Sequence, residues 1–507
     1  MSHKQAGTID VSGNDNAPTA LSVRNLGHLP AAVRVPRYAR ENLSAGIVHI
    51  GLGNFHRAHQ AWYLHRLMDQ DACHDWAIIG AGVRPSDAAQ RERLMAQDCL
   101  TTLIELDPSS TSAEVVGSMI DYIPVEPNNG ALIDCMAQAD VRIVSLTVTE
   151  GGYYIDLATG GFDQAHPDIA HDATNLSAPK TAFGAIVAAL AKRRAGGLGP
   201  FSCLSCDNLQ GNGAILQRAV VGLAQLADAD LAAWIDANCT FPNSMVDCIV
   251  PATGPDELAM ARSFGIADQA PVTHENFRQW VIEDNFCAGR PDWDRVGATF
   301  ASDVHDYEAM KLRVLNGGHQ LIAIPGELLS IDSIAGTMAH ADIAAFLRRA
   351  VVEEIAPNVA PVPGMDPLSY LELIEGRFSN SKIIDTTRRV AFDGSSRQPG
   401  FIVPSIRDAL ANGQPVEGLA LMSALWMRYS QGTREDGSVI EANDPNWVEL
   451  GHVAEEAKSN PMAWLSQTQY YGDLADASRF AHVFKRWAEM LNSDGTAAAL
   501  RAYSQQG

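Results

Sequence analysis

Short apolar runs that end in glycine or in polar turn residues recur along residues 45–298. Four of them, rich in Ile, Val and other small apolar residues, lie at residues 47–51, 76–80, 141–147 and 201–206. Segments with apolar residues at helical spacing, such as 58–68 and 181–194, lie between them. Strands that alternate with helices form mostly parallel sheets covered on both faces. This part of the chain is therefore predicted to be a Rossmann-like α/β domain.

The pattern changes beyond residue 300. Strand-like runs become rare, and Ala- and Leu-rich amphipathic stretches dominate at 305–322, 337–355, 405–430 and 475–503. We therefore predict three parts: a polar N-terminal lead-in over residues 1–44, a Rossmann-like domain over 45–298, and a mainly α-helical domain over 299–507. Pro30 and Pro36 interrupt the lead-in.

Composition narrows the class of protein. A chain of 507 residues is too long for one ordinary core, and its 46% hydrophobic content is typical of a soluble globular protein. The formal net charge of -23 makes nucleic acid and anionic membranes poor partners. The sequence has no apolar run of membrane-spanning length and no signal-peptide core, and its eight cysteines are scattered, so we expect a reducing, cytoplasmic location.

A glycine-rich turn follows the first predicted strand. In Gly51-Leu-Gly53-Asn-Phe-His56, the first glycine permits a tight turn and the second lets the backbone approach a pyrophosphate. The third glycine of the usual dinucleotide signature is replaced by His56. An ordinary strand-to-helix turn is the alternative, but the strand–helix–strand context favours a nucleotide site.

An acidic residue beyond the second predicted strand is a candidate for selecting the cofactor. Asp87 follows Gly80 and the segment 81–86, and its carboxylate could accept hydrogen bonds from the adenosine ribose. The alternative is that Asp87 only stabilises the first turn of the helix predicted at 88–94.

The most informative stretch lies in the second domain. On a regular helix with about 100° per residue, Glu308, Lys311 and His319 fall within roughly an 80° arc, and Asn316 widens it to about 140°. Oxidation of an alcohol needs a group that takes the hydroxyl proton, and a lysine does this near neutral pH only when its surroundings lower its pKa. The alternative is a solvated lysine on an amphipathic helix.

Two other chemistries compete. Tyr307-x-x-x-Lys311 matches the tyrosine–lysine pair of short-chain dehydrogenases, although that pair belongs to single domains of about half this length. Cys203-x-x-Cys206 could serve zinc or redox chemistry, but no second cysteine pair accompanies it. We expect no metal.

At these residues the sequence resembles the polyol-specific long-chain dehydrogenases, the family typified by mannitol 2-dehydrogenase. The resemblance covers about residues 45–430. Its motifs are Gly51-Leu-Gly-Asn-Phe-His-Arg-Ala-His59, Thr147-Val-Thr-Glu-Gly-Gly-Tyr153, Ser205-Cys-Asp-Asn-Leu209, Phe241-Pro-Asn-Ser-Met-Val-Asp247, Lys311-Leu-Arg-Val-Leu-Asn-Gly-Gly-His319 and Arg377-Phe-Ser-Asn380.

The resemblance implies a metal-independent dehydrogenase of secondary alcohols that works as a monomer. It implies that Lys311 is the general acid and base and that the amides of Asn208 and Asn316 hold the reacting oxygen. It also implies that Glu150 lines a proton path to the lysine and that Glu308 is a carboxylate beside it. The implied substrate contacts are His319, Asp247, Arg389 and Arg397. The implied cofactor is NAD rather than NADP, because Asp87 would repel a 2′-phosphate, and the other cofactor contacts are Gly51, Gly53, Phe55, His56 and Arg57.

Departures from the family pattern leave the substrate open. Arg397 replaces a lysine, Cys248 replaces an arginine and Gly318 replaces a common serine. D-mannitol and D-fructose are the leading pair. Residues 62–66 resemble D-arabinitol 4-dehydrogenases, residues 277–286 resemble fructuronate reductases, and Arg389 with Arg397 would suit a uronate. A nucleotide-binding regulatory protein without catalysis is the alternative from another class, although Lys311 and both asparagines argue against it.

Overall fold

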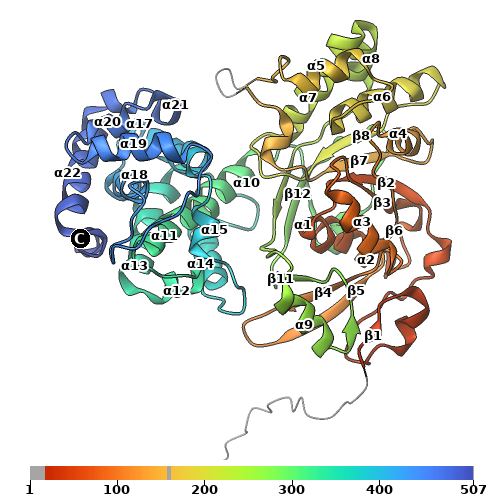
Figure 1. Cartoon of the computed structure of the whole chain (residues 1–507), viewed down its shortest axis with the longest axis horizontal. Coiled ribbons are helices and arrows are strands. Elements are labelled where there is room, and N and C mark those ends of the chain that lie inside the picture. The colour runs from red at the N-terminus through yellow and green to blue at the C-terminus, as the bar shows by residue number, and fades with distance from the viewer. Residues whose placement is uncertain (1–16, 157–160, 506–507) are drawn as a thin grey trace, which may run out of the picture.

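A five-stranded parallel sheet forms the centre of the N-terminal domain (Figure 1). The computed structural model describes residues 17–156 and 161–505. The strand order is β6-β3-β2-β7-β8, the arrangement of a Rossmann sheet with its first strand in the middle. The strands are β2 (Ala45–Ile50), β3 (Ala77–Ala81), β6 (Met119–Tyr122), β7 (Ile143–Leu146) and β8 (Ser202–Ser205).

Alternate residues of this sheet face two separate apolar layers. Ile47 and Ile143 pack into one layer, whereas the neighbouring Val48 and Val144 pack into the other. All four side chains are fully buried. Burial on both faces explains why these strands are mostly apolar rather than alternating, and the buried polar exceptions His49 and Ser145 are hydrogen-bonded to each other at 2.8 Å.

Helices cover both faces of the sheet. Thr181 caps α6 by accepting a hydrogen bond from the Gly184 amide, and Asp228 caps α8 in the same way. The helices of this domain are α1 (Asn54–Ala58), α2 (Gln60–Met68), α3 (Asp87–Met95), α4 (Gly130–Met136), α5 (Pro167–Thr174), α6 (Ala182–Ala195), α7 (Asn212–Ala227), α8 (Ala229–Asn238) and α9 (Pro255–Ser263).

Two three-stranded sheets lie beside the Rossmann sheet, and the apolar pattern did not predict them. One has the order β11-β4-β5 and the other β13-β12-β9, each with one parallel and one antiparallel pair. Their strands are β4 (Thr101–Leu106), β5 (Thr111–Val116), β9 (Ser244–Asp247), β11 (Val272–Glu275), β12 (Gln279–Glu283) and β13 (Thr299–Ala301).

The described part of the lead-in packs against this domain. Strand β1 (Thr19–Ala20) pairs in parallel with β10 (Ile266–Ala267), and the side chains of Leu21 and Val33 are buried. The Arg40 guanidinium donates to the carbonyl of Gly117 at 2.9 Å. The segment from residue 17 onward is therefore part of the packed structure rather than a separate tail.

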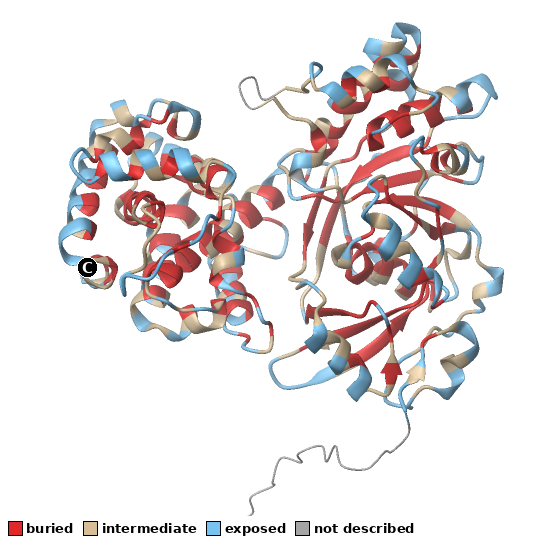
Figure 2. Cartoon of the chain, in the orientation of Figure 1, coloured by how far each residue is buried: buried red, intermediate tan, exposed pale blue. Residues whose placement is uncertain are grey.

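The C-terminal domain is helical and is built around two buried helices. In α11 (Gly317–Leu328) and α18 (Glu417–Tyr429) nearly every residue is buried, and the other helices surround them (Figure 2). These are α12 (Ile334–Ala339), α13 (Ala341–Ala350), α14 (Pro367–Phe378), α15 (Thr387–Ala391), α16 (Gly394–Arg397), α17 (Val403–Ala411), α19 (Trp447–Ala457), α20 (Met462–Leu465), α21 (Thr468–Tyr471), α22 (Ser478–Asp494) and α23 (Thr496–Ser504).

The stretch predicted as one helix over 305–322 is helical throughout but not regular. It runs as α10 (His305–Met310), a π-helical segment over Lys311–Asn316, and α11. The angles calculated for a regular α-helix are therefore wrong past residue 311. The stretch predicted over 475–503 is likewise divided at Gly495 (φ +79°), and the one over 405–430 is divided after α17.

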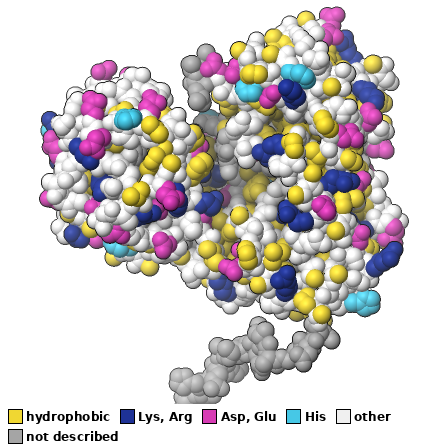
Figure 3. All heavy atoms as spheres, in the orientation of Figure 1, with side chains coloured by type: hydrophobic (Ala, Val, Ile, Leu, Met, Phe, Trp, Pro, Cys, Tyr) yellow, Lys and Arg dark blue, Asp and Glu magenta, His cyan; other side chains and the backbone are white. Residues whose placement is uncertain are grey.

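Figure 1 places α10 between the two lobes, and Figure 3 shows the surface hollowed where they meet. Charged side chains of both signs are scattered over the face in view. Among the described helices, none combines the length and the apolar character needed to cross a membrane.

Candidate active site

The loops that follow β7 and β8 are joined by a buried aspartate. The Asp207 carboxylate accepts hydrogen bonds from the backbone amides of Val148 and Thr149 at 3.0 and 2.9 Å and from the Tyr153 hydroxyl at 2.7 Å. Thr149 has a positive φ of 67°. The carboxylate thus fixes an unusual turn at the carboxyl edge of the sheet, next to the β2–β7 boundary where the order of strands reverses.

Lys311 meets this edge from the other domain. Its Nζ donates to the Asn208 Oδ1 at 2.7 Å, and the lysine is only 5% exposed. Asn208 itself is exposed. The amine and the amide predicted to act together therefore lie in contact, although 103 residues separate them.

The π-helical segment brings Asn316 toward Lys311. Each backbone amide of a π-helix bonds five residues back, so residues 311 and 316 lie one turn apart. On a regular α-helix they would point about 140° apart. The described residues contain two further π-helical segments, Val351–Ile355 and Gln398–Ile402, so the functional reading of this one rests on the residues it brings together.

Glu308 lies one turn before Lys311 and is 4% exposed. Both of its carboxylate oxygens accept from the Gly211 amide at 3.2 Å. Burial raises the pKa of this carboxyl to about 7, and the neighbouring Glu283 and Asp303 raise it further against the opposing effect of the Gly211 amide and Lys311. Glu308 therefore changes charge near neutral pH.

The residues expected to contact substrate hydroxyls lie near one another. Asp247 ends β9 and is buried, and the Arg377 guanidinium holds its carboxylate in a two-pronged contact at 2.7 and 2.9 Å. His319 stacks on Phe378 with ring centroids 4.2 Å apart. Its Nε2 is buried and has no hydrogen-bond partner among the described residues.

Burial, together with the charges of three arginines, keeps the pKa of His319 well below its usual value. Two of them are the other predicted substrate contacts. Arg389 makes a two-pronged ion pair with the buried Asp385 at 2.6 and 2.5 Å, and Arg397 donates to the Val390 carbonyl at 2.5 Å. The imidazole is therefore neutral near neutral pH.

The glycine-rich turn has the shape that a dinucleotide needs. Gly51 has a φ of +93°, and a Cβ there would lie 2.2 Å from the Thr147 carbonyl oxygen, so only glycine fits. At Gly53 an added Cβ would meet nothing closer than 4.0 Å, so the backbone is open on that side. The turn is thus compressed at the first glycine and accessible at the second.

Three further residues of the same motif support the turn from beneath. His56 is 1% exposed and stacks on His49 at 3.5 Å, and burial holds its pKa well below the usual value. Phe55 stacks on His59 at 4.8 Å. Arg57 is also 1% exposed and donates to the Asn54 Oδ1 at 2.6 Å and to the Ala270 carbonyl.

Asp87 is the first residue of α3, just beyond β3. Its Oδ2 accepts from the Arg84 amide at 3.0 Å, so it does stabilise the turn that precedes the helix. Its side chain stays 20% exposed, and it lies so close to Gly82 that a Cβ there would approach within 2.3 Å. It therefore occupies the end of β3, where the adenosine ribose binds in Rossmann domains.

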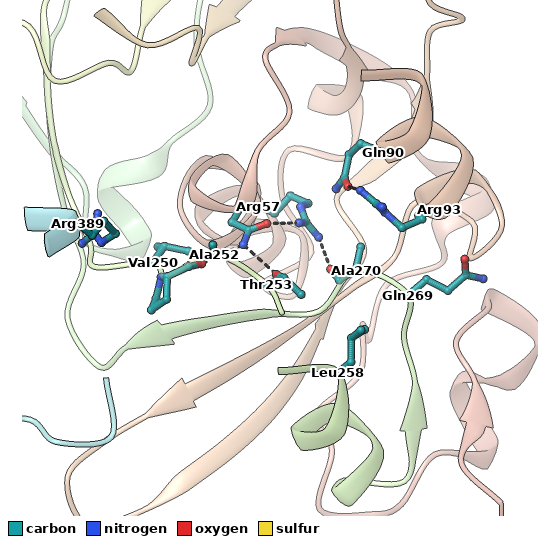
Figure 4. A pocket seen from close by; sticks show the side chains of 12 residues that line it. Arg57, Gln90, Arg93, Val250, Ala252, Thr253, Leu258, Gln269, Ala270 and Arg389 are labelled. Atoms are coloured by element: carbon teal, nitrogen blue, oxygen red, sulfur yellow. Dashed lines mark hydrogen bonds between the residues drawn. The ribbon is translucent and has the colours of Figure 1, made fainter. Parts of the chain in front are cut away.

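A cavity of about 550 Å³ opens beside the glycine-rich turn (Figure 4). Arg57, Gln90 and Arg93 line it from the N-terminal domain, and Arg389 lines it from α15 across the gap. Guanidinium and amide groups around a cavity of this volume suit a phosphate-bearing ligand.

The remaining expectations concern Glu150 and the cysteines. Glu150 begins a short 3-10 helix over Glu150–Tyr153, but its side chain lies outside the described part of the structure. Cys203 is buried on β8 with its Sγ 4.0 Å from that of Cys239, and Cys206 is buried at the strand's end. Burial raises the pKa of both Cys203 and Cys206 well above the usual value, which leaves these thiols unreactive.

Both domains match models of a known protein family. Residues 45–295 match the family model described as the mannitol dehydrogenase Rossmann domain, and residues 303–491 match the mannitol dehydrogenase C-terminal domain. The chain belongs to the mannitol dehydrogenase family.

Relatives match along most of their length. A mannitol 2-dehydrogenase of Cereibacter sphaeroides is 56% identical over 93% of this chain and 99% of its own. One from Phaeosphaeria nodorum is 40% identical over 96% of this chain and 86% of its own.

Two solved structures superpose on both domains. The Pseudomonas fluorescens mannitol 2-dehydrogenase, solved as a ternary complex with NAD and D-mannitol, has a TM-score of 0.90 at 39% identity and covers 96% of this chain and 100% of its own. A D-sorbitol dehydrogenase in substrate-free form has a TM-score of 0.86 at 32% identity, covering 95% and 100%. The Rossmann fold with a helical C-terminal domain predicted from the sequence is confirmed.

Three residues of this mannitol dehydrogenase family member were not singled out from the sequence although they shape the site. Asp207, Arg377 and Tyr370 hold the loops and the Asp247 carboxylate. Asp207 and Arg377 lie inside motifs that the family resemblance had already marked, which was the available signal. Tyr370 carries no such mark, because its role depends on contact with a strand 123 residues away.

Proposed function

We propose that the protein catalyses the reversible, NAD-dependent oxidation of D-mannitol to D-fructose. The observation that carries the proposal is the contact between the buried Lys311 Nζ and the Asn208 Oδ1 at the meeting of the two domains. The family relatives named mannitol 2-dehydrogenase, and the ternary complex with NAD and D-mannitol in a related structure, support the substrate and the cofactor.

The residues around the glycine-rich turn fit NAD. Gly51 and Gly53 would bring the backbone close to the pyrophosphate, and the cavity beside them offers Arg57 and Arg93. The Asp87 carboxylate at the end of β3 would accept the ribose hydroxyls and repel a 2′-phosphate. When bound, the cofactor would supply a hydride acceptor as NAD in oxidation and a hydride donor as NADH in reduction.

Lys311 acts as the general base in oxidation. The neutral amine takes the proton of the reacting hydroxyl, and the ammonium returns it in the reverse direction. Because Asn208 uses its Oδ1 to accept from Nζ, its amide Nδ2 is directed elsewhere and donates to the oxygen that becomes negative. Asn316, one π-turn from the lysine, supplies the second amide.

Glu308 carries the proton away from Lys311. Its pKa of about 7 equals neutral pH, so the carboxyl accepts and releases protons there without a large cost in free energy. Glu150 extends this path toward solvent in our proposal.

His319 and Asp247 bind the other hydroxyls. The neutral imidazole can donate or accept at its buried Nε2, and the carboxylate accepts. Arg389 and Arg397 complete the site in our proposal. A neutral polyol is better supported than a uronate, because Arg389 is offset by Asp385, and Arg377 by Asp247 and Glu275.

The first test is an initial-rate panel. D-mannitol, D-sorbitol, D-arabinitol, D-fructose and fructuronate are assayed with NAD(H) and NADP(H) by absorbance of the reduced nicotinamide. We expect the highest kcat/KM for mannitol and fructose with NAD(H). Tight NAD binding without turnover of any of these compounds would instead support a regulatory protein.

The second test is Lys311→Ala. We expect kcat to fall by about 1,000-fold or more, because the variant lacks the base, while NADH binding followed by fluorescence stays within about twofold of wild type. An active variant would refute the role of the lysine.

We further infer that the division between the domains lies between β13 and α10, that the chain acts as a monomer, and that it works in the cytoplasm. β13 pairs with β12 of the N-terminal domain, which supports a boundary just past residue 301. Light scattering coupled to size exclusion, with an expected mass near 54.5 kDa, tests the monomer.

A further inference from the structure

A second contact between the domains lies at the end of α14. Arg377 reaches from this helix to the last residues of two strands, Asp247 of β9 and Glu275 of β11. It donates to Asp247 at 2.7 and 2.9 Å and to Glu275 at 2.9 and 2.7 Å. The three side chains are 4%, 5% and 2% exposed, so this is a buried ionic cluster that joins the domains.

The neighbouring residues dock on the same edge. The Asn380 side-chain amide donates to the Leu106 carbonyl at 2.8 Å, and the Lys382 Nζ donates to the Ser110 carbonyl at 2.9 Å. Ile383 packs into an apolar cluster with Ile104 of β4. The segment 377–383 is thus the place where the helical domain rests on the β11-β4-β5 sheet.

Joining two domains through this buried ionic cluster costs free energy of desolvation. A buried ion pair often stabilises a protein no more than apolar residues of similar volume, because both charges lose their hydration. Here one guanidinium faces two carboxylates, which leaves a net negative charge. Burial raises the pKa of Glu275, whereas Arg377 outweighs burial at Asp247 and holds the pKa of that carboxyl below its usual value. A role beyond stability would explain why Asp247 is kept ionised.

The hydrogen bonds that the Asp247 carboxylate accepts indicate what this further role is. An ionised carboxylate offers about four lone-pair positions. Oδ2 accepts from the Arg377 Nη1 and from the Tyr370 hydroxyl at 3.2 Å, and Oδ1 accepts from the Arg377 Nη2. Among the described residues these are its donors, so one position stays open on Oδ1. The planar fork of arginine fixes the direction in which that position points.

We propose that Arg377 is a positioning residue that orients the Asp247 carboxylate for a substrate hydroxyl and thereby makes polyol binding depend on the docking of the two domains. This inference rests on the proposed function, which makes Asp247 a substrate contact. Arg377 has both carboxylates as partners only when segment 377–383 lies on the sheet. Tyr370 assists by filling the second position on Oδ2.

The test is a double-mutant cycle between Arg377→Lys and Asp247→Asn. A lysine keeps the charge but cannot form the two-pronged contact. We expect Arg377→Lys to raise the KM for mannitol by about 10-fold or more, with a smaller change in kcat and NADH affinity within about twofold of wild type. In the Asp247→Asn background the same change should alter KM by less than about twofold, because the two residues act through one contact.

Arg348→Lys is the matched control. Arg348 lies on α13 and pairs with Glu375 of α14, the helix that carries Arg377, but the Arg348 side chain is 53% exposed. Its kinetics should equal those of wild type. Tyr370→Phe removes a single hydroxyl and tests the same contact if Arg377→Lys does not fold. We expect it to raise the KM for mannitol by about threefold.

The outcomes distinguish failure of the proposed function from failure of the positioning role of Arg377. Wild-type protein that does not turn over mannitol would overturn the proposed function. An active wild type in which Arg377→Lys lowers only thermal stability, or adds its full effect to that of Asp247→Asn, would overturn the positioning role. Unchanged kinetics in Tyr370→Phe would count against it as well.

Discussion

At the scale of single residues, the raised pKa of Glu308 leads to a testable change in the pH dependence of turnover. Its carboxyl has a pKa of about 7, and it lies one turn from Lys311. We expect Glu308→Gln to remove an ionisation near pH 7 from the pH profile of kcat for mannitol oxidation and to lower kcat above that pH. Asp306→Asn, on the exposed side of the same helix, is the control and should keep the wild-type profile.

The same group affects stability in a definite direction. Because the folded protein holds the Glu308 proton more tightly than the unfolded chain, the contribution of this group falls as pH rises from about 4.5 to about 7. In Glu308→Gln the free energy of unfolding in urea should fall less steeply with pH across that range, while the buried Glu354, whose pKa is also raised to about 7, keeps its own contribution. An identical slope in the variant would show that the carboxyl titrates elsewhere.

Asp87 predicts cofactor choice. Its carboxylate, 20% exposed at the end of β3, should repel the 2′-phosphate of NADP. In Asp87→Ala the ratio of kcat/KM with NAD to kcat/KM with NADP should fall by about 10-fold or more, mostly because kcat/KM with NADP rises. If the ratio is unchanged and only thermal stability falls, the residue serves the turn before α3 alone.

At the scale of elements, the glycine-rich turn allows a matched pair of substitutions. Gly51→Ala would drive a Cβ to 2.2 Å from the Thr147 carbonyl oxygen at a φ of +93°, so we expect it to lose roughly 2–4 kcal/mol of stability as well as NAD affinity. Gly53→Ala meets no atom within 4.0 Å, so it should keep the melting temperature and lose only NAD affinity. Normal NAD affinity in Gly53→Ala would contradict close approach of the pyrophosphate to this backbone.

The sequence predicted elements where local pattern decides them. The strands around Ile47 and Ile143 form the centre of the sheet and were predicted because burial on both faces makes them largely apolar. The run beginning at Trp76 was predicted one residue too early, since Trp76 belongs to a short 3-10 turn and β3 begins at Ala77. The strands around Ile104 and Val281 were missed, because pairing with partners far along the chain, rather than local periodicity, fixes them.

The π-turn at 311–316 had no sequence signal. Propensities and periodicity distinguish helix from strand, but a single wider turn depends on tertiary packing. The candidate residues could still be named, because Lys311, Asn316 and His319 lie in one motif of the family that the sequence resembles. Their relative directions could not be predicted.

At the scale of the whole molecule, the sequence predicted two domains but not how they meet. Lys311 and Asn208 come from different domains, and so do Arg377 and Asp247. Contacts between residues separated by 103 and 130 positions leave no trace in local pattern. The family motifs marked these residues without saying which of them touch.

Because the Lys311 Nζ and the Asn208 Oδ1 come from opposite lobes and lie 2.7 Å apart, the proposed reaction depends on how far apart the two lobes are held. An inhibitor need not imitate a sugar or a nucleotide. A compound that binds between the lobes and moves them apart by about the width of one water molecule would separate the pair and, in the proposed mechanism, stop turnover, while leaving the fold of each lobe intact.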